Sequence, residues 1–290
     1  FGKGVAVAVR HDGPVWDYVN YMGANAKPIT DKILPHIAIP TTAGTGSEVT
    51  TSAVLDNPQT HMKASIVTPL VYPRVAIIDP ELTYSMPAKV TAMTGFDALT
   101  HGIEGYLNSA RSSLASDIFT LETVRLVTQN LGRVVENGDD HKARACMSWA
   151  ATLGGISISV SSVTVAHGMG LPLGSRLHVP HGLGLSRLLP VVLAHSWQAQ
   201  PARYAVLADL VGATKAGMDE NEKAQTLAVW LKDFIKKIGL DSMWIDLGID
   251  GAGLDQLTED VFGYMGRLVQ VHRPIFDKRQ IRELFEKAIR

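Results

Sequence analysis

Asp97 and His101 are the two residues of this sequence whose types and spacing most directly suggest chemistry. They lie four residues apart in a segment, residues 94–105, whose apolar residues recur at helical spacing. We therefore expect a buried helix here, with both side chains on one of its faces. A carboxylate and an imidazole on one helix face form half of a site for a divalent metal ion. For one pair alone, however, a hydrogen-bonded Asp–His contact in the core is the better interpretation.

Two further histidines favour the metal site. His167 and His181 each precede a glycine, and each lies in apolar sequence. With Asp97 and His101 they supply one carboxylate and three imidazoles, which is a complete ligand set for Fe(II) or Zn(II). The sequence does not choose between these two ions. We predict that the four side chains converge on one divalent metal ion.

A glycine-rich segment, residues 41–50, is the second candidate for function. Hydroxyl side chains and two glycines dominate it, and a helix that starts near Ser47 would direct free N–H groups at an anion. On pattern alone, a phosphate- or ribose-binding turn and an ordinary loop are equally good interpretations. Lys63 lies further along, in a short apolar segment. It could reach a ribose or phosphate, although such a lysine is usually a solvated edge residue.

The elements that must position these residues fall into two groups, with a domain boundary near Met86. Before it, the pattern predicts short strands that end at turns or prolines; they cover residues 37–39, 53–56, 63–66 and 75–78, the last being the clearest buried strand. Residues 4–10 alternate Val and Ala, which fits a short strand or a helix end. After Met86 helical periodicity dominates, with amphipathic helices at residues 220–238 and 277–289.

Composition limits the classes of partner. The 290 residues carry a net charge of -1 without basic runs, which argues against nucleic acid or an anionic membrane as the main partner. The longest apolar run, residues 151–166, is shorter than the roughly 20 residues that a membrane span needs. Cys146 is the only cysteine, and no secretory signal is visible. We expect a two-domain protein of the cytoplasm.

Taken together, the motifs resemble those of the iron-containing (group III) alcohol dehydrogenases. The likeness rests on residues 40–48, on residues 95–105, on His167 and on Pro180-His181-Gly182, in the expected order. It implies an α/β dinucleotide-binding domain, apparently incomplete here, over residues 1–86. An all-α metal-binding domain would follow over residues 87–290, in a dehydroquinate synthase-like architecture. The active site would lie between the two domains.

The resemblance also implies roles for single residues and an activity. The metal ligands would be Asp97, His101, His167 and His181. Residues in the nucleotide-binding turn or near the cofactor ribose would be Thr41, Thr42, Thr45, Ser47 and Lys63. The activity would be reversible hydride transfer between a small alcohol and NAD or NADP, with an aldehyde or ketone as product. For residues 4–10 the resemblance implies a helix and not a strand. It also implies a homo-oligomer such as a dimer.

Two features depart from the family pattern. The Gly-Gly-Gly-Ser loop that normally holds the cofactor pyrophosphate would precede Phe1, so we expect it in an upstream segment of a longer protein. Leu171 occupies a position, four residues after the third ligand, where many members carry a histidine. The leucine removes one candidate proton carrier and should favour substrates with hydrocarbon bulk over polyols.

Alternatives to an alcohol dehydrogenase remain at this stage. One is a polyol oxidoreductase like glycerol dehydrogenase, and another is a fragment or metal-stabilised helical domain without catalysis. Dehydroquinate synthase activity ranks low, because the segments around Asp97 and His167 supply few cations for a substrate with phosphate and carboxylate groups. The sequence identifies neither the alcohol nor the choice between NAD and NADP.

Overall fold

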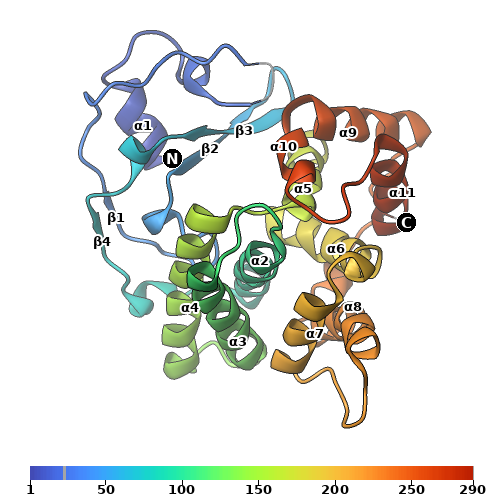
Figure 1. Cartoon of the computed structure of the whole chain (residues 1–290). Coiled ribbons are helices and arrows are strands. Elements are labelled where there is room, and N and C mark those ends of the chain that lie inside the picture. The colour runs from blue at the N-terminus through green and yellow to red at the C-terminus, as the bar shows by residue number, and fades with distance from the viewer. Residues whose placement is uncertain (22–23, 290) are drawn as a thin grey trace.

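The computed structural model describes residues 1–21 and 24–289. A short α/β part at the N-terminus is followed by an all-helical part, which makes up most of the chain (Figure 1). Among the described residues, every strand precedes Met86, and the long helices begin with α2 (Ala88–Leu107). The fold class predicted from the sequence is therefore confirmed. The domain boundary near Met86 remains a prediction that agrees with this order of elements.

The N-terminal part contains two small sheets. Helix α1 (Gly2–Ala8) confirms the helix that the family resemblance assigned to this region. Strands β2 (Ser52–Asn57) and β3 (Met62–Val67) confirm the strands predicted at residues 53–56 and 63–66, and they pair antiparallel, whereas β1 (Ile37–Ala38) and β4 (Val75–Ala76) pair in parallel. Short 3-10 helices connect these elements at Val15–Tyr18, Ser47–Val49, Pro69–Val71 and Pro80–Thr83.

The prediction of a well-buried strand at residues 75–78 is wrong in two respects. Strand β4 contains only Val75 and Ala76, and the side chains of Val75 and Ile77 are 47% and 46% exposed. A run of branched apolar residues is typical of a strand covered on both faces. In the described residues, however, this parallel sheet has two strands, so apolar residues on it remain uncovered. Ile37 of β1 is exposed for the same reason.

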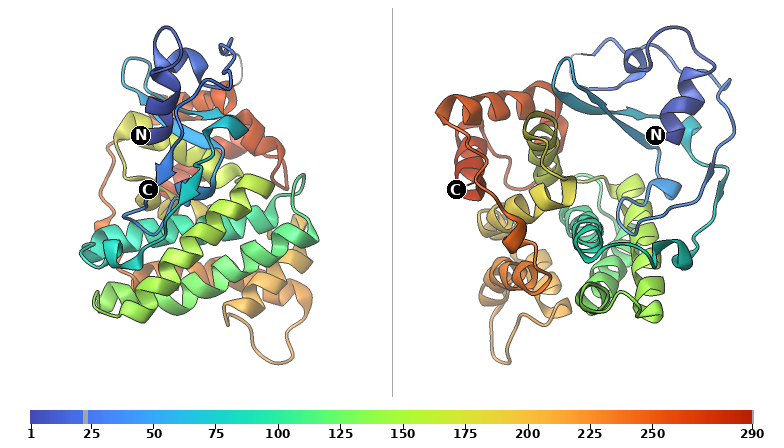
Figure 2. Two further views of the ribbon diagram at one scale, coloured as in Figure 1. Left: turned by 90° about the vertical axis from the view of Figure 1, so that its left-hand side faces the viewer. Right: turned by 180° about the vertical axis from the view of Figure 1, so that it is seen from behind.

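The helical part is built around α2. From Gly95 to Leu107 every residue of this helix is buried, including the polar side chains of Asp97, His101 and Glu104. It packs against α3 (Leu114–Glu136), α4 (His141–Ser161) and α6 (His181–Ala194). Figure 2 shows α2, α3 and α4 running side by side. Polar side chains define where the long helices start: Ser113 forms a capping box with Ser116 before α3, and Asp140 caps α4.

The remaining helices complete the core and confirm both amphipathic helices. Helix α8 (Glu220–Lys237) begins with a capping box at Asp219, and α11 (Lys278–Ile289) presents an apolar face to the core. The other helical elements are α5 (Val165–Leu177), α7 (Pro201–Leu210), α9 (Gly251–Tyr264), α10 (Gly266–Gln270) and 3-10 helices at Trp197–Ala199 and Asp241–Met243. No single helix in the described ranges is both long and apolar enough to cross a membrane; α4 and α5 meet that test only as a pair, across a bend of 108°.

A second apolar core joins the two parts of the chain. We call it the second core; its fully buried members are Val7, Tyr18, Val19, Ala53, Ala64, Ile66, Val71, Tyr264, Met265 and Leu268. The first seven belong to the N-terminal part, whereas the last three come from α9, α10 and the residue between them. Contacts between β3 and α5 lie beside this core. The N-terminal part is therefore attached to the region of the helical part that contains His167.

Candidate metal centre and cofactor turn

Helix α2 supplies Asp97 and His101 as predicted. Both side chains are buried, and their spacing of four residues places them one turn apart on the same face. The Nε2 atom of His101 lies 3.5 Å from Oδ1 of Asp97. This distance exceeds that of a normal hydrogen bond, so the pair is close without being directly bonded.

Helices α5 and α6 bring the other two histidines to the same oxygen. His167 lies in the first turn of α5, and His181 is the first residue of α6. Their Nε2 atoms each lie 3.4 Å from Oδ1 of Asp97. Ligand atoms of a tetrahedral metal site with bonds of about 2.1 Å are themselves about 3.4 Å apart. The three His–Asp distances therefore match the edges of such a site.

The unpaired atoms of this cluster also fit a cation. Oδ1 of Asp97 and Nε2 of His167 are buried and have no hydrogen-bond partner among the described residues. Leaving buried polar atoms unpaired is costly, and a divalent ion would satisfy both at once. Candidate ligand atoms of Asp97, His167 and His181 all lie within 4.8 Å of one another. His101 lies outside this group of three and approaches it through Oδ1 of Asp97, at 3.5 Å.

The electrostatics of the cluster favour binding of a positive ion. Burial raises the pKa of Asp97, but the three imidazoles outweigh it and hold that pKa below its ordinary value. Burial lowers the pKa of His101 and lowers that of His181 to about 4, so both are neutral, the form that binds metal. Burial also lowers the pKa of His167, yet the carboxylates of Glu104 and Asp97 reverse this and raise it to about 9. Metal binding would therefore displace a proton from His167.

The glycine after His181 has a specific structural role. A Cβ atom on Gly182 would lie 2.0 Å from the carbonyl oxygen of Met93, which belongs to the backbone of α2. Only glycine therefore lets the first turn of α6 approach α2 closely enough for His181 to reach Asp97. The glycine after His167 is less constrained, because a Cβ atom on Gly168 would be 3.2 Å from the Leu268 side chain.

Sequence reasoning missed the role of Glu104. This residue is 1% exposed, and its Oε2 atom lies 2.5 Å from Nδ1 of His167, on the side of the ring opposite the metal cluster. Glu104 follows His101 by three residues, so it extends the face of α2 that carries Asp97 and His101. That spacing was visible in the sequence, but the partner of Glu104 lies 63 residues away.

The glycine-rich turn lies against the helices that carry the cluster. Thr41, Thr45 and Ser47 are exposed and Thr42 is half-buried, whereas Gly44 and Gly46 face inwards. A Cβ atom on Gly44 would meet Thr94 of α2 at 2.8 Å. Gly46, with a φ of +58°, lies on Gly155 of α4, where a Cβ atom would be only 2.4 Å from the Gly155 Cα. The hydroxyls are thus presented on the outside of a turn that touches α2 and α4.

Polar contacts hold the same turn in place. Glu48 is buried and accepts a hydrogen bond of 2.7 Å from the Thr152 hydroxyl of α4. Lys3 of α1 is also buried and donates to the carbonyl and hydroxyl oxygens of Thr50 and to the Ser52 carbonyl, at 2.7, 2.8 and 3.0 Å. Burial lowers the pKa of Lys3 to about 8, although Glu48 opposes this shift. The turn is therefore fixed to both parts of the chain.

Lys63 and Leu171 lie where the N-terminal part meets α5. Lys63 is half-buried on β3, and its charge is one of the causes, after burial, that lower the pKa of His181. Leu171 is half-buried and packs against the second core. Leu171 thus packs at the junction of the two parts of the chain.

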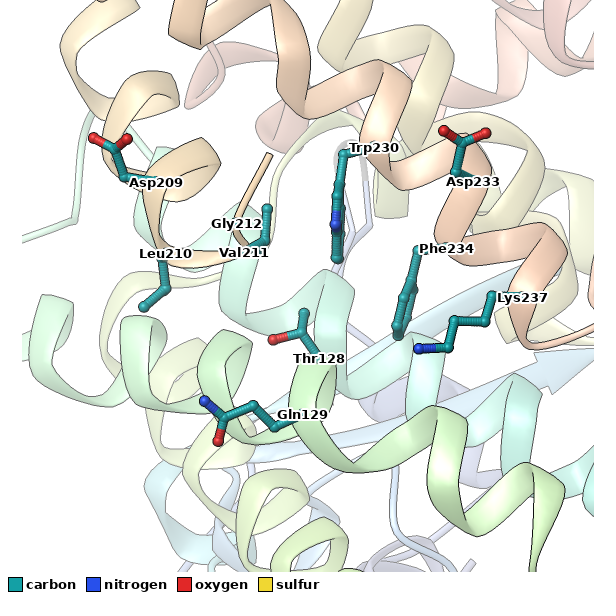
Figure 3. A pocket seen from close by; sticks show the side chains of 10 residues that line it. All are labelled: Thr128, Gln129, Asp209, Leu210, Val211, Gly212, Trp230, Asp233, Phe234 and Lys237. Atoms are coloured by element: carbon teal, nitrogen blue, oxygen red, sulfur yellow. The ribbon is translucent and has the colours of Figure 1, made fainter. Parts of the chain in front are cut away.

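A surface hollow lies away from this cluster, in the helical part of the chain. Figure 3 shows it between α3 and the region of α7 and α8, lined in part by Asp233 and by the stacked rings of Trp230 and Phe234. None of the predicted metal or cofactor residues lines it. This hollow is therefore separate from the candidate site.

Comparison with known proteins agrees with this geometry. A family model described as iron-containing alcohol dehydrogenase matches residues 1–80, and one described as the C-terminal part of the Fe-containing alcohol dehydrogenase family matches residues 91–289. The chain is 35% identical over 286 residues to long-chain-alcohol dehydrogenase 1 of Geobacillus thermodenitrificans. That match covers 99% of this chain and 71% of the relative, and three further relatives are covered to 63% or 65%. This chain therefore spans about two thirds of the length of these relatives.

Solved structures share the fold. An archaeal halo-thermophilic alcohol dehydrogenase from a Red Sea brine pool has a TM-score of 0.92 at 31% identity, with 99% of this chain and 73% of that one covered. The sulfoacetaldehyde reductase of Bifidobacterium kashiwanohense, solved in complex with NAD+, has a TM-score of 0.85 at 28% identity, with 99% and 72% covered. From the two family models and these relatives we conclude that the chain belongs to the iron-containing alcohol dehydrogenase family.

Proposed function

We propose that this chain provides the metal site and part of the cofactor site of an NAD(P)-linked, metal-dependent alcohol dehydrogenase. The convergence of three imidazoles on one unpaired oxygen of Asp97 is the observation that carries this proposal. Asp97, His101, His167 and His181 would hold the ion, Fe(II) or Zn(II). The reaction would interconvert an alcohol with an aldehyde or ketone.

The residues of the site suit this chemistry. A divalent ion would act as a Lewis acid that stabilises negative charge on the alcohol oxygen, while the nicotinamide accepts or returns the hydride. The four ligands carry one negative charge, so the occupied site keeps a net positive charge. The burial of Asp97, His101 and His167 strengthens this electrostatic effect, whereas the His181 side chain is 27% exposed. Lys63 adds a second positive charge, which helps to lower the pKa of His181.

The cofactor would bind along the glycine-rich turn. The side chains of Thr41, Thr42, Thr45 and Ser47 are at least partly accessible, and hydroxyls are suitable partners for ribose and phosphate oxygens. Gly44 brings this turn against α2, the helix that carries Asp97 and His101. A dinucleotide bound there would therefore extend towards the metal site. Lys63 would contact its ribose or phosphate groups.

The substrate would be a small alcohol with hydrocarbon bulk. The relatives named above act on different compounds, a long-chain alcohol and sulfoacetaldehyde, so family membership alone does not select the substrate. The half-buried Leu171 gives the neighbourhood of α5 an apolar character. This character favours alcohols with hydrocarbon bulk over polyols. Assembly as a homo-oligomer and location in the cytoplasm remain predictions from the sequence.

An assay with matched lysine variants tests this function. The protein is loaded with Fe(II) or Zn(II), and reduction of NAD+ and NADP+ is followed with ethanol, butanol, 1,3-propanediol and glycerol. We expect metal-dependent activity that a chelator removes. Lys63→Met should raise the KM for the cofactor about tenfold, because a hydrogen bond to a charged group contributes about 1.5–3 kcal/mol. Lys32→Met, at an exposed lysine, is the matched control and should change nothing.

The outcomes separate the alternatives. A protein that binds the metal but reduces neither cofactor with any alcohol would be a metal-stabilised helical domain, contrary to the proposal. Higher turnover with glycerol than with butanol would favour a polyol oxidoreductase. An unchanged cofactor KM in the Lys63 variant would remove this lysine from the cofactor site.

A further inference from the structure

We propose that Glu104 is a positioning residue that holds His167 with its Nε2 lone pair directed at the metal site. Glu104 would do so in two ways, by accepting a hydrogen bond from Nδ1 of His167 and by capping the helix that carries this histidine. The inference rests on the proposed metal site, although it requires no catalytic activity.

The first contact fixes the state of the imidazole ring. Oε2 of Glu104 lies 2.5 Å from Nδ1 of His167, and both side chains are buried. An ionised carboxylate only accepts hydrogen bonds, so Nδ1 must carry the proton. The opposite nitrogen, Nε2, faces Asp97 and has no hydrogen-bond partner among the described residues. In the neutral ring this leaves the Nε2 lone pair free to bind a metal.

The second contact fixes the helix. Thr164 stands at the N-cap position of α5, but its side chain makes no capping hydrogen bond. Oε1 of Glu104 accepts instead from the backbone N–H of Ala166 at 2.7 Å and from the Thr164 hydroxyl at 2.6 Å. A carboxylate of α2 thus takes the place of the usual capping side chain and suits the positive end of the helix dipole.

A further histidine, His272, contacts the Thr164 hydroxyl and so supports this arrangement. The Thr164 hydroxyl has one proton, and the short contact to Glu104 shows where it is donated. Its oxygen therefore accepts from Nδ1 of His272, 3.2 Å away, while Nε2 of His272 lies 2.8 Å from the Ser196 hydroxyl. His272 is buried, as are Ser196 and Thr164, so solvent does not reach the series of hydrogen bonds that runs from Ser196 to His167. Every oxygen of Glu104 then has a donor, which keeps the carboxylate in one orientation.

Two variants separate the contact of Glu104 with His167 from its contact with the Thr164 hydroxyl. In Glu104→Gln, the amide oxygen would accept from Ala166 and Thr164, because an amide N–H group placed there would face two other donors. The amide nitrogen would then face Nδ1 of His167, act as a donor and move the ring proton to Nε2. Capping would be retained, but the lone pair would point away from the metal. Thr164→Val removes the hydroxyl that donates to Oε1, but it leaves both the contact between Glu104 and His167 and the cap at the Ala166 N–H.

Zinc titration with a competing chelator is the test, with thermal unfolding of the metal-free variants in parallel. We expect Glu104→Gln to weaken Zn(II) binding about 10–100-fold, the usual cost of losing the partner behind a histidine ligand. Thr164→Val should lower the Tm, because it leaves Nδ1 of the buried His272 without its acceptor, while its Zn(II) affinity stays within about threefold of the wild type. Equal Zn(II) affinity in Glu104→Gln and the wild type, or an equal loss in Thr164→Val, would overturn the proposal. Absence of Zn(II) binding by the wild type would instead contradict the metal site itself.

A measurement on the wild type covers the case in which Glu104→Gln does not fold. Long-range ¹H–¹⁵N NMR of the Zn(II)-loaded protein reports which ring nitrogen of each histidine carries the proton. We expect His167 to be protonated at Nδ1 and bound to the metal through Nε2. Protonation at Nε2, with Nδ1 bound to the metal or deprotonated, would overturn the proposal.

Discussion

Asparagine in place of Asp97 is expected to abolish stoichiometric binding of the divalent metal. Three imidazole nitrogens lie within 3.5 Å of one Asp97 oxygen, so this carboxylate is the common element of the ligand set. Asparagine keeps the shape of the side chain but removes its negative charge and places a donor group or a weaker ligand at the centre. Affinity should fall by more than about 100-fold, since even partners outside the ligand set usually contribute about 10–100-fold.

The measurement is metal content after loading with Zn(II), or with Fe(II) under anaerobic conditions, followed by dialysis. Asp233→Asn is the matched control, because Asp233 lies on α8 at the separate surface hollow (Figure 3). We expect about one metal ion per chain in the wild type and in Asp233→Asn, and almost none in Asp97→Asn. Equal metal content in all three proteins would contradict the assignment of Asp97.

Alanine in place of Gly182 is expected to damage both stability and metal binding. The added Cβ atom would lie 2.0 Å from the carbonyl oxygen of Met93, and a backbone atom of a buried helix cannot move aside easily. Helix α6 would have to shift away from α2 and would carry His181 with it. Such overpacking costs about 1–3 kcal/mol, and the displaced imidazole should weaken metal binding as well.

Gly263→Ala on α9 is the matched control for this substitution. A Cβ atom there has nothing within 4 Å, so alanine should leave the fold intact and stabilise the helix by up to about 1 kcal/mol. Urea unfolding of the metal-free proteins gives the free energy of unfolding, and Zn(II) titration gives the affinity. If Gly182→Ala matched Gly263→Ala in both quantities, the close approach of α6 to α2 would not determine the position of His181.

Much of the proposed ligand set follows from local rules. Asp97 and His101 are four apart on one helix, and helical spacing alone places them on one face. His167 and His181 were recognised by their residue type and by the family motifs, not by any rule that links them to α2 in space. The structure supplies that link through the close contact at Gly182.

The role of Glu104 could not be derived from the sequence in the same way. Its spacing from His101 predicts the face on which it lies, but its partners are Thr164, Ala166 and His167. These residues come together only when α5 packs across the end of α2. A long-range contact of this kind has no periodic signature, whereas the helix that contains Glu104 has one.

Burial of single strands and side chains was also beyond the sequence pattern. The apolar run at residues 75–78 predicts a strand that other elements cover on both faces. In the described sheet, however, Val75 and Ile77 are about half exposed. For Leu171, one-turn spacing predicts a position near His167, yet it does not show that the second core packs against this side chain. In both cases the pattern describes the residue itself, whereas burial depends on what else packs there.

X-ray absorption spectroscopy of the metal-loaded protein tests the metal site most directly. It reports the type, number and distance of the atoms bound to Zn(II) or Fe(II) without depending on activity. We predict one ion per chain, with three imidazole nitrogens and one carboxylate oxygen at about 2.0–2.2 Å, and loss of this signal in Asp97→Asn. An ion bound through a different set of ligands, or a signal unchanged in Asp97→Asn, would contradict the assignment of Asp97, His101, His167 and His181.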